Sequence, residues 1–138
     1  MGKSREDLVK WALDKAEQYL NSAKANLDEE RLHPAAEDIF RTMETSLETL
    51  LYYNGIKKVE YPGKKKKFTG RLALQFLIRD TLLKRGKIEK EVYNKYLELA
   101  TDLHSGGYEG GRYFEKDELN EAFEFTEDFF LFVVVQTK

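Results

Sequence analysis

Residues 34–55 read PAAEDIFRTMETSLETLLYYNG, the most regular stretch of the chain. Apolar side chains recur there at intervals of three and four residues, which places them on one face of a helix. They are Ala36, Ile39, Phe40, Met43, Leu47, Leu50 and Leu51. Pro34 suits a first helical turn, and Asn54-Gly55 suits a helix end. The segment therefore predicts a long amphipathic helix.

Segments on both sides of this helix repeat the same apolar spacing. Upstream, Ser4 followed by Asp7 resembles a capping box at the start of a helix. Downstream, Gly86 and the glycine-rich stretch 105–111 end two further helices. The predicted helices span about Ser4 to Asp28, Pro34 to Tyr53, Arg71 to Arg85, Ile88 to His104, and Lys116 to the end of the chain. We predict an all-α, up-and-down helical bundle of four long helices plus one shorter helix.

Only one feature favours a strand. Val133, Val134 and Val135 are β-branched residues that pack well in sheets. Because no second strand signal accompanies them, we expect this segment to be helical.

The composition is that of one folded domain, residues 1–138. Hydrophobic residues make up 41% of the 138 residues, which is enough for one core. The absence of cysteine excludes disulfides, thiolate nucleophiles and cysteine metal sites, and it favours a reducing compartment. The longest apolar run, 129–135, is too short to span a bilayer, and the first residues form no apolar leader. We therefore expect a cytoplasmic protein with no membrane association.

A basic loop precedes the third predicted helix. Between Lys57 and Arg71 there are seven basic residues and one acidic residue, and Tyr61 and Phe68 lie among them. Basic groups neutralise phosphates and aromatic rings stack on bases, so this pattern predicts a nucleotide or RNA site. The alternative is a solvated loop whose charge has no ligand. The predicted binding residues are Lys64, Lys65, Lys66, Lys67, Arg71 and Tyr108.

The last predicted helix has the opposite charge. Residues 115–128 hold seven acidic side chains and one lysine. This face could steer a partner protein or a second copy of the chain. The alternative is an ordinary solvated helix surface.

His104 is the candidate catalytic residue. It ends the fourth predicted helix, and its near-neutral pKa suits a general base or a phosphate-orienting group. The alternative is a structural histidine. The only other histidine, His33, lies far away in sequence, so we predict no metal site and no cofactor. Carboxylate pairs such as Glu44 and Glu48 are typical of a solvated helix surface.

The order of these elements resembles the HEPN domain, over about Lys10 to Phe130. The resemblance is carried by ALDKAEQYLNSA at 12–23, by residues 35–51 leading to Tyr53-Asn54-Gly55, by GKIEKE at 86–91 and by Tyr108. It implies a helical bundle, commonly dimeric, that works beside a minimal nucleotidyltransferase or as a metal-independent RNase in toxin–antitoxin and defence systems.

The RNase members of this family carry an arginine followed, after four to six intervening residues, by a histidine. His104 matches the histidine, but the positions for the arginine hold Leu97, Glu98 and Leu99. The first hypothesis is therefore a non-catalytic HEPN-like protein that binds a nucleotide, RNA or a nucleotidyltransferase partner. A second is an RNase in which Arg71, Arg112 or a loop lysine replaces the missing arginine. A third is a purely structural interaction module.

We also predict a homodimer. The resemblance implies one, and the last helix carries more large side chains than one stripe can bury. These side chains are Phe123, Phe125, Phe129, Phe130 and Phe132.

Overall fold

The computed structural model describes residues 4–104, 110 and 112–138, and 74% of it is helical. In chain order its elements are α1 (Arg5–Asp28), α2 (Leu32–Tyr53), β1 (Glu60–Tyr61), β2 (Phe68–Thr69), α3 (Gly70–Leu77), η1 (Ile78–Leu83), α4 (Lys90–Leu99), η2 (Ala100–His104) and α5 (Lys116–Gln136). The segments η1 and η2 are π-helical continuations of α3 and α4. The predicted all-α class is confirmed.

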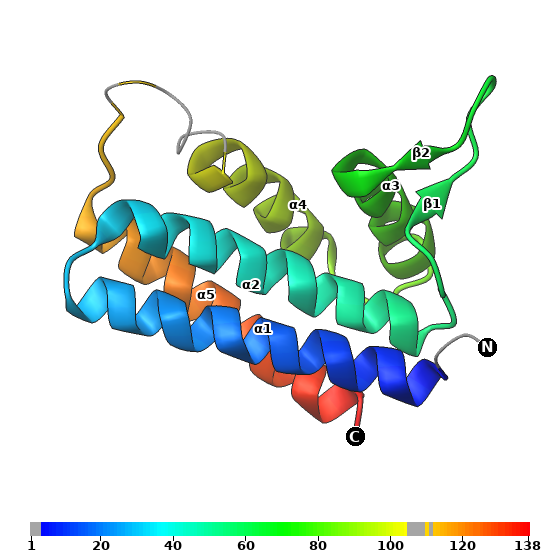
Figure 1. Cartoon of the computed structure of the whole chain (residues 1–138), viewed down its shortest axis with the longest axis horizontal. Coiled ribbons are helices and arrows are strands. Elements are labelled where there is room, and N and C mark those ends of the chain that lie inside the picture. Colours follow the sequence, from blue (N-terminus) through cyan, green and yellow to red (C-terminus); the bar gives the residue numbers. More distant parts are fainter. Residues whose placement is uncertain (1–3, 105–109, 111) are drawn as a thin grey trace.

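Helix α2 is the centre of the fold, in contact with α1, α5, η1, α4 and η2 (Figure 1). Its apolar residues Ile39, Phe40 and Met43 are completely buried. Polar residues of α2 are buried too, and their hydroxyls donate to the carbonyl oxygen four residues earlier, as Ser46 does to Thr42 at 2.7 Å. Such internal bonds let a helix bury polar residues away from water.

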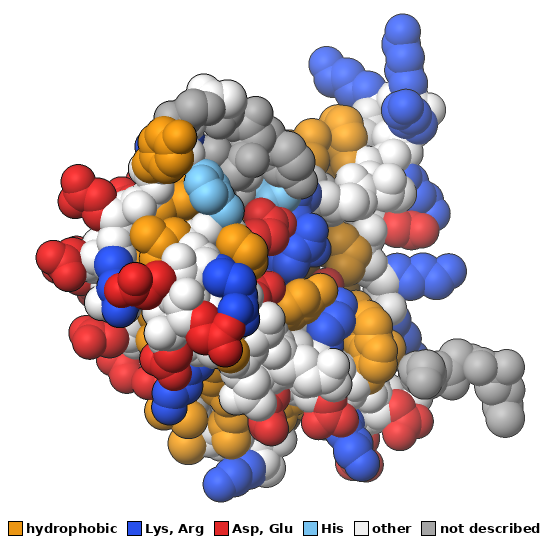
Figure 2. Space-filling view, turned by 60° about the vertical axis from the view of Figure 1, so that its left-hand side comes forward, with side chains coloured by type: hydrophobic (Ala, Val, Ile, Leu, Met, Phe, Trp, Pro, Cys, Tyr) orange, Lys and Arg blue, Asp and Glu red, His pale blue; other side chains and the backbone are white. Residues whose placement is uncertain are grey.

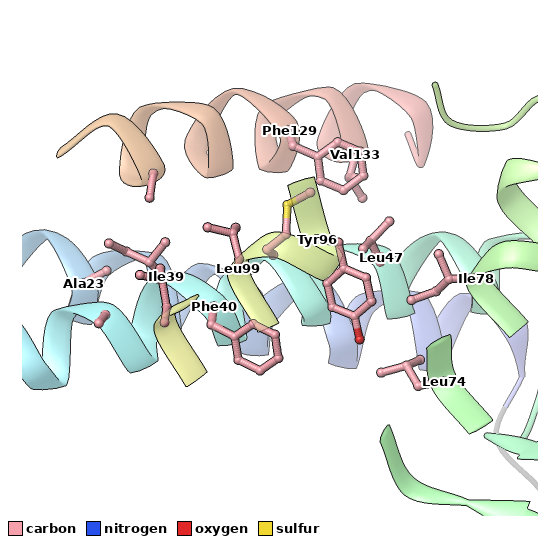
Figure 3. Close-up of a cluster of buried hydrophobic side chains, with 14 of the residues drawn as sticks. Ala23, Ile39, Phe40, Leu47, Leu74, Ile78, Tyr96, Leu99, Phe129 and Val133 are labelled. Atoms are coloured by element: carbon pink, nitrogen blue, oxygen red, sulfur yellow. The ribbon is translucent and has the colours of Figure 1, made fainter. Parts of the chain in front are cut away.

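The core lies between α2 and the helices around it. Figure 3 shows Phe129 and Val133 approaching from α5, while Leu74 and Ile78 approach from α3 and η1. Tyr96 of α4 is also completely buried. Residues from nearly every helix therefore share one apolar cluster.

The expected set of four long helices and one shorter helix is confirmed only in part. Three helices exceed twenty residues: α1 with 24, α2 with 22 and α5 with 21. The segments 70–83 and 90–104 are shorter. Gly70 is the first residue of α3 and Gly86 follows the end of η1, and their φ values of +71° and +70° lie in a backbone region that glycine tolerates.

The loop after α2 contains a short hairpin that the sequence did not predict. Its strands are antiparallel, with Glu60 opposite Thr69 and Tyr61 opposite Phe68. In Figure 1 the hairpin projects from one end of the molecule beside α3. The strands have two residues each, so no alternating pattern could have revealed them.

Helix α5 confirms the helical expectation for residues 133–135. Fewer of its large aromatic side chains are exposed than we predicted, because α5 packs against both α1 and α2. Phe129 and Phe130 are buried, Phe123 and Phe125 are partly buried, and Phe132 is 41% exposed. Across the described ranges, no helix is long and apolar enough to cross a membrane.

Candidate functional site

His104, at the end of η2, is held by a carboxylate. Its Nδ1 atom lies 3.1 Å from both carboxylate oxygens of Glu37, and its ring stacks on Phe40 at 5.0 Å. In the neutral ring, Nδ1–H donates to Glu37, so Nε2 keeps the lone pair. The side chain is 17% exposed. This arrangement orients a nitrogen that can accept a proton.

Arg71, in the first turn of α3, contacts that nitrogen. Its Nη1 atom lies 2.9 Å from Nε2 of His104. Its Nε and Nη2 groups donate to the two carboxylate oxygens of Glu44 at 2.8 and 3.0 Å. The guanidinium also lies over the Phe40 ring, 4.9 Å from its centroid. Hydrogen bonding to Glu44 raises the pKa of Arg71, so the group is permanently cationic.

Glu44 has a third partner, Tyr96 of α4. The Tyr96 hydroxyl donates to Oε2 of Glu44 at 2.7 Å, and its ring lies parallel to Phe40 at 6.1 Å. Burial is the main cause that raises the pKa of Tyr96 well above its usual range, so the phenol stays a donor. Glu44 thus accepts three hydrogen bonds, two from Arg71 and one from Tyr96.

We name this group of six side chains the Arg71–His104 cluster. It consists of Glu37, Phe40, Glu44, Arg71, Tyr96 and His104. Arg41 lies beside it and donates to Glu37 at 2.9 Å. With His104 neutral, two arginines balance two glutamates, so the cluster and Arg41 together carry no net charge.

The cluster has the parts that phosphodiester chemistry requires. Nε2 of His104 can take a proton from a hydroxyl group, and a guanidinium can stabilise negative charge developing on a phosphate. The bonds to Glu44 and His104 use three of the five N–H groups of Arg71. Because Arg71 is one-third exposed, its remaining N–H groups can be reached from solvent.

The structure thus brings together two of the predicted site residues, Arg71 and His104, which are 33 positions apart. The four lysines of the loop lie elsewhere, exposed in the turn of the hairpin. Figure 2 shows basic side chains gathered at the tip of this projection. Tyr108 lies outside the described residues.

The other candidates contact different groups. Arg112 lies 3.8 Å from Glu118 and over the Phe114 ring. His33 packs edge-on against Phe114 with ring centroids 5.3 Å apart. Within the described part of the chain, no three histidine, cysteine, aspartate or glutamate side chains cluster closely enough to hold a metal ion.

Sequence reasoning missed Glu37, Glu44 and Tyr96 as members of a site. The expectation that Glu44 is a solvated surface group was wrong, since its side chain is only 13% exposed. A signal was present: Glu37, Phe40 and Glu44 follow at intervals of three and four, on one face of α2. That spacing shows that the three side chains share one face of the helix, but it does not show which residues of other elements contact that face.

Two comparisons, one with curated proteins and one with solved structures, found no match. The family model of the HEPN domain matches residues 9–136, nearly the whole chain and slightly more than the 10–130 that the sequence resemblance covered. The match includes most of α1, all of α2, the hairpin and all later helices, and with them every member of the Arg71–His104 cluster. The helical fold is consistent with this match, which covers nearly the whole chain. The chain therefore belongs to the HEPN domain family.

Proposed function

We propose that this protein is a metal-independent endoribonuclease in which Arg71 supplies the arginine missing from helix α4. Membership of the HEPN family implies a nucleotide- or RNA-associated function. The observation that carries the finer proposal is the 2.9 Å contact between Nη1 of Arg71 and Nε2 of His104. It favours the second sequence hypothesis over the non-catalytic first.

The proposed reaction uses the RNA itself as nucleophile. Nε2 of His104 takes the proton of a 2′-hydroxyl while that oxygen attacks the adjacent phosphorus, and the bond from phosphorus to the 5′-oxygen breaks. The leaving oxygen takes a proton from the imidazolium or from water, giving a cyclic phosphate and a 5′-hydroxyl. Glu37 stabilises the imidazolium that forms, and Arg71 exchanges its bond to His104 for the phosphate oxygens. The products carry the atoms and charge of the substrate.

The test is cleavage of labelled RNA in the presence of a chelator. His104→Ala and Arg71→Ala are each expected to lower the rate by about 100-fold or more, the size of a lost base or a lost oxyanion donor. His33→Ala is the matched control, because this histidine packs against Phe114 outside the cluster. Cleavage that is absent from the wild type, or equally fast in His104→Ala, would refute the proposal.

A second candidate is a non-catalytic protein that binds RNA or a nucleotide and partners a minimal nucleotidyltransferase of a toxin–antitoxin or defence system. The two hydrogen bonds from Arg71 to Glu44 favour this second candidate, because a carboxylate competes with a phosphate for the same guanidinium. Glu44→Gln separates the candidates. If Glu44 positions Arg71 for catalysis, the variant cleaves more slowly; if Glu44 withholds Arg71, the variant binds RNA more tightly and still does not cleave.

A copurification experiment addresses the partner. The second candidate predicts a stable complex with a nucleotidyltransferase encoded beside this chain, and that complex persists in His104→Ala. If the protein neither cleaves nor binds RNA or nucleotides and captures no nucleotidyltransferase, the third hypothesis, a purely structural interaction module, remains.

A further inference from the structure

The hairpin is attached to the bundle by specific contacts at its base. The Tyr61 hydroxyl donates to Asp80 of η1, and the Tyr61 ring lies 5.0 Å from the ring of Phe76. Phe68, opposite Tyr61 in the ladder, meets Phe76 edge-on at 5.9 Å. Arg79 donates to Asp80 at 2.9 Å, and its guanidinium carbon lies over the same Phe76 ring, 4.9 Å from the ring centroid. The base of the hairpin therefore has a defined position.

The turn of the hairpin concentrates positive charge. Lys64, Lys65, Lys66 and Lys67 are consecutive and exposed, and the acidic residue near them, Glu60, pairs with Lys67 at 3.4 Å. Four like charges in a row repel one another, so each gains when an anion binds between them. Consecutive exposed ammonium groups are suited to successive phosphates of a nucleic acid strand.

An aromatic ring lies beside these lysines. Phe68 is 37% exposed, and together with Pro62, Gly63 and the first three lysines it lines an open pocket of about 680 Å³. Gly63 has no room for a side chain, because a Cβ atom would lie 2.4 Å from the carbonyl oxygen of Lys66. The turn is thus tightly closed, and its apolar side is available to the face of a base.

The hairpin also leads directly to the Arg71–His104 cluster. Strand β2 ends at Thr69 and α3 begins at Gly70, so a single residue separates the ladder from Arg71. From Lys67 to Arg71 the chain spans four residues, at most about 14 Å when extended. A strand that is bound along the lysines and continues toward α3 therefore needs only a few nucleotides to reach Arg71 and His104.

From this placement we infer that the hairpin is a binding arm for single-stranded RNA, which holds phosphates on Lys64–Lys67 and a base against Phe68 and directs the strand to the Arg71–His104 cluster. Binding by the arm stands on the hairpin alone, whereas delivery to the cluster rests on the proposed function. A single strand is favoured over a duplex because stacking on a side chain requires an unpaired, accessible base face.

The first experiment measures binding of labelled oligouridine by fluorescence anisotropy at several salt concentrations. Replacing all four lysines of the turn by serine is expected to flatten the slope of log affinity against log salt by about 0.7 per lost contact, or about 2 to 3 in total. Phe68→Leu keeps an apolar contact with Phe76 but removes the stacking face, and it is expected to weaken binding about 5- to 100-fold. The matched control compares Lys65→Ser/Lys66→Ser with Lys10→Ser/Lys24→Ser, whose lysines are exposed on α1.

The arm would be overturned by an unchanged salt slope in the quadruple variant, by equal loss in the α1 control, or by equal affinity of the wild type for a duplex of the same sequence. If light scattering shows that the quadruple variant loses self-association while its RNA binding is intact, the hairpin is a contact between copies of the chain and the arm is wrong. A wild type without measurable RNA affinity also rejects the arm.

A second experiment separates this inference from the proposed function. The wild type is expected to cleave a long strand with a lower KM than a dinucleotide, which cannot reach the lysines and the cluster together. The quadruple variant is expected to lose that advantage. If the enzyme cleaves both lengths with equal KM, the arm is wrong and the nuclease stands. If no length is cleaved but the salt slope flattens as expected, the arm stands and the nuclease is wrong.

Discussion

The bond between Arg71 and Glu44 can be measured as a coupling free energy. Two charged hydrogen bonds of 2.8 and 3.0 Å join the groups, whose side chains are 33% and 13% exposed. At an effective dielectric constant of about 20, two charges about 4 Å apart attract by about 4 kcal/mol, and desolvation offsets much of this. Exposed pairs retain about 0.2 to 1 kcal/mol, and loss of one partner from a buried pair costs about 3 to 5 kcal/mol. For this half-buried pair we expect a coupling of about 1 to 2 kcal/mol.

The assay is urea unfolding, followed by circular dichroism, of the wild type, Glu44→Gln, Arg71→Gln and the double variant. Glutamine at position 44 keeps an acceptor for the Tyr96 hydroxyl, so the variant isolates the charge on Glu44. The coupling is expected to persist in high salt, because screening acts weakly on a partly buried pair.

The exposed pair Lys67–Glu60, with a 3.4 Å separation, supplies the control, and its coupling is expected to be below about 0.5 kcal/mol. A coupling for Arg71 and Glu44 that is as small as the control would refute the reasoning. It would mean that the guanidinium exchanges Glu44 for water without cost and that Glu44 does not position it.

Three further predictions concern the core, the hairpin and the assembly. Met43→Ala is expected to lower the free energy of unfolding by about 2 to 5 kcal/mol, because the side chain is completely buried in α2; a loss below about 1 kcal/mol in urea unfolding would contradict this. The bonds from Arg79 and Tyr61 lower the pKa of Asp80, so its contribution to stability is present above the unfolded pKa of 3.8 and is lost as the pH falls further; acid titration of Asp80→Asn should lack this component. Light scattering is expected to show a dimer that Phe132→Asp weakens, and a monomer in the micromolar range would count against it.

The apolar spacing of residues 34–55 was sufficient to predict α2 and, with the neighbouring segments, the all-α class. The spacing is sufficient because a helix returns to the same face every three to four residues, whatever packs against it. Gly86 likewise marked the end of a predicted helix, since its positive φ lies outside the range of an α-helix. Properties of this kind are local, and they can be inferred from the order of residues alone.

The hairpin could not be inferred in this way. Two residues per strand give no alternation, and the strands depend on Tyr61 meeting Phe76 and Asp80, which follow fifteen or more positions later. The basic charge of the turn was visible in the sequence. Its presentation on an anchored projection was not.

For the candidate site, too, some features could be inferred from the sequence and others only from the tertiary structure. The sequence by itself identified His104 as a candidate base, Arg71 as one of several possible replacements for the missing arginine, and the HEPN family as the relative. Only the tertiary structure brings Arg71 and His104 together, because both side chains lie against the Phe40 ring of α2, and this places residues 33 positions apart at 2.9 Å. Periodicity fixes which face of a helix is buried, but which side chains meet across that face depends on how the helices pack.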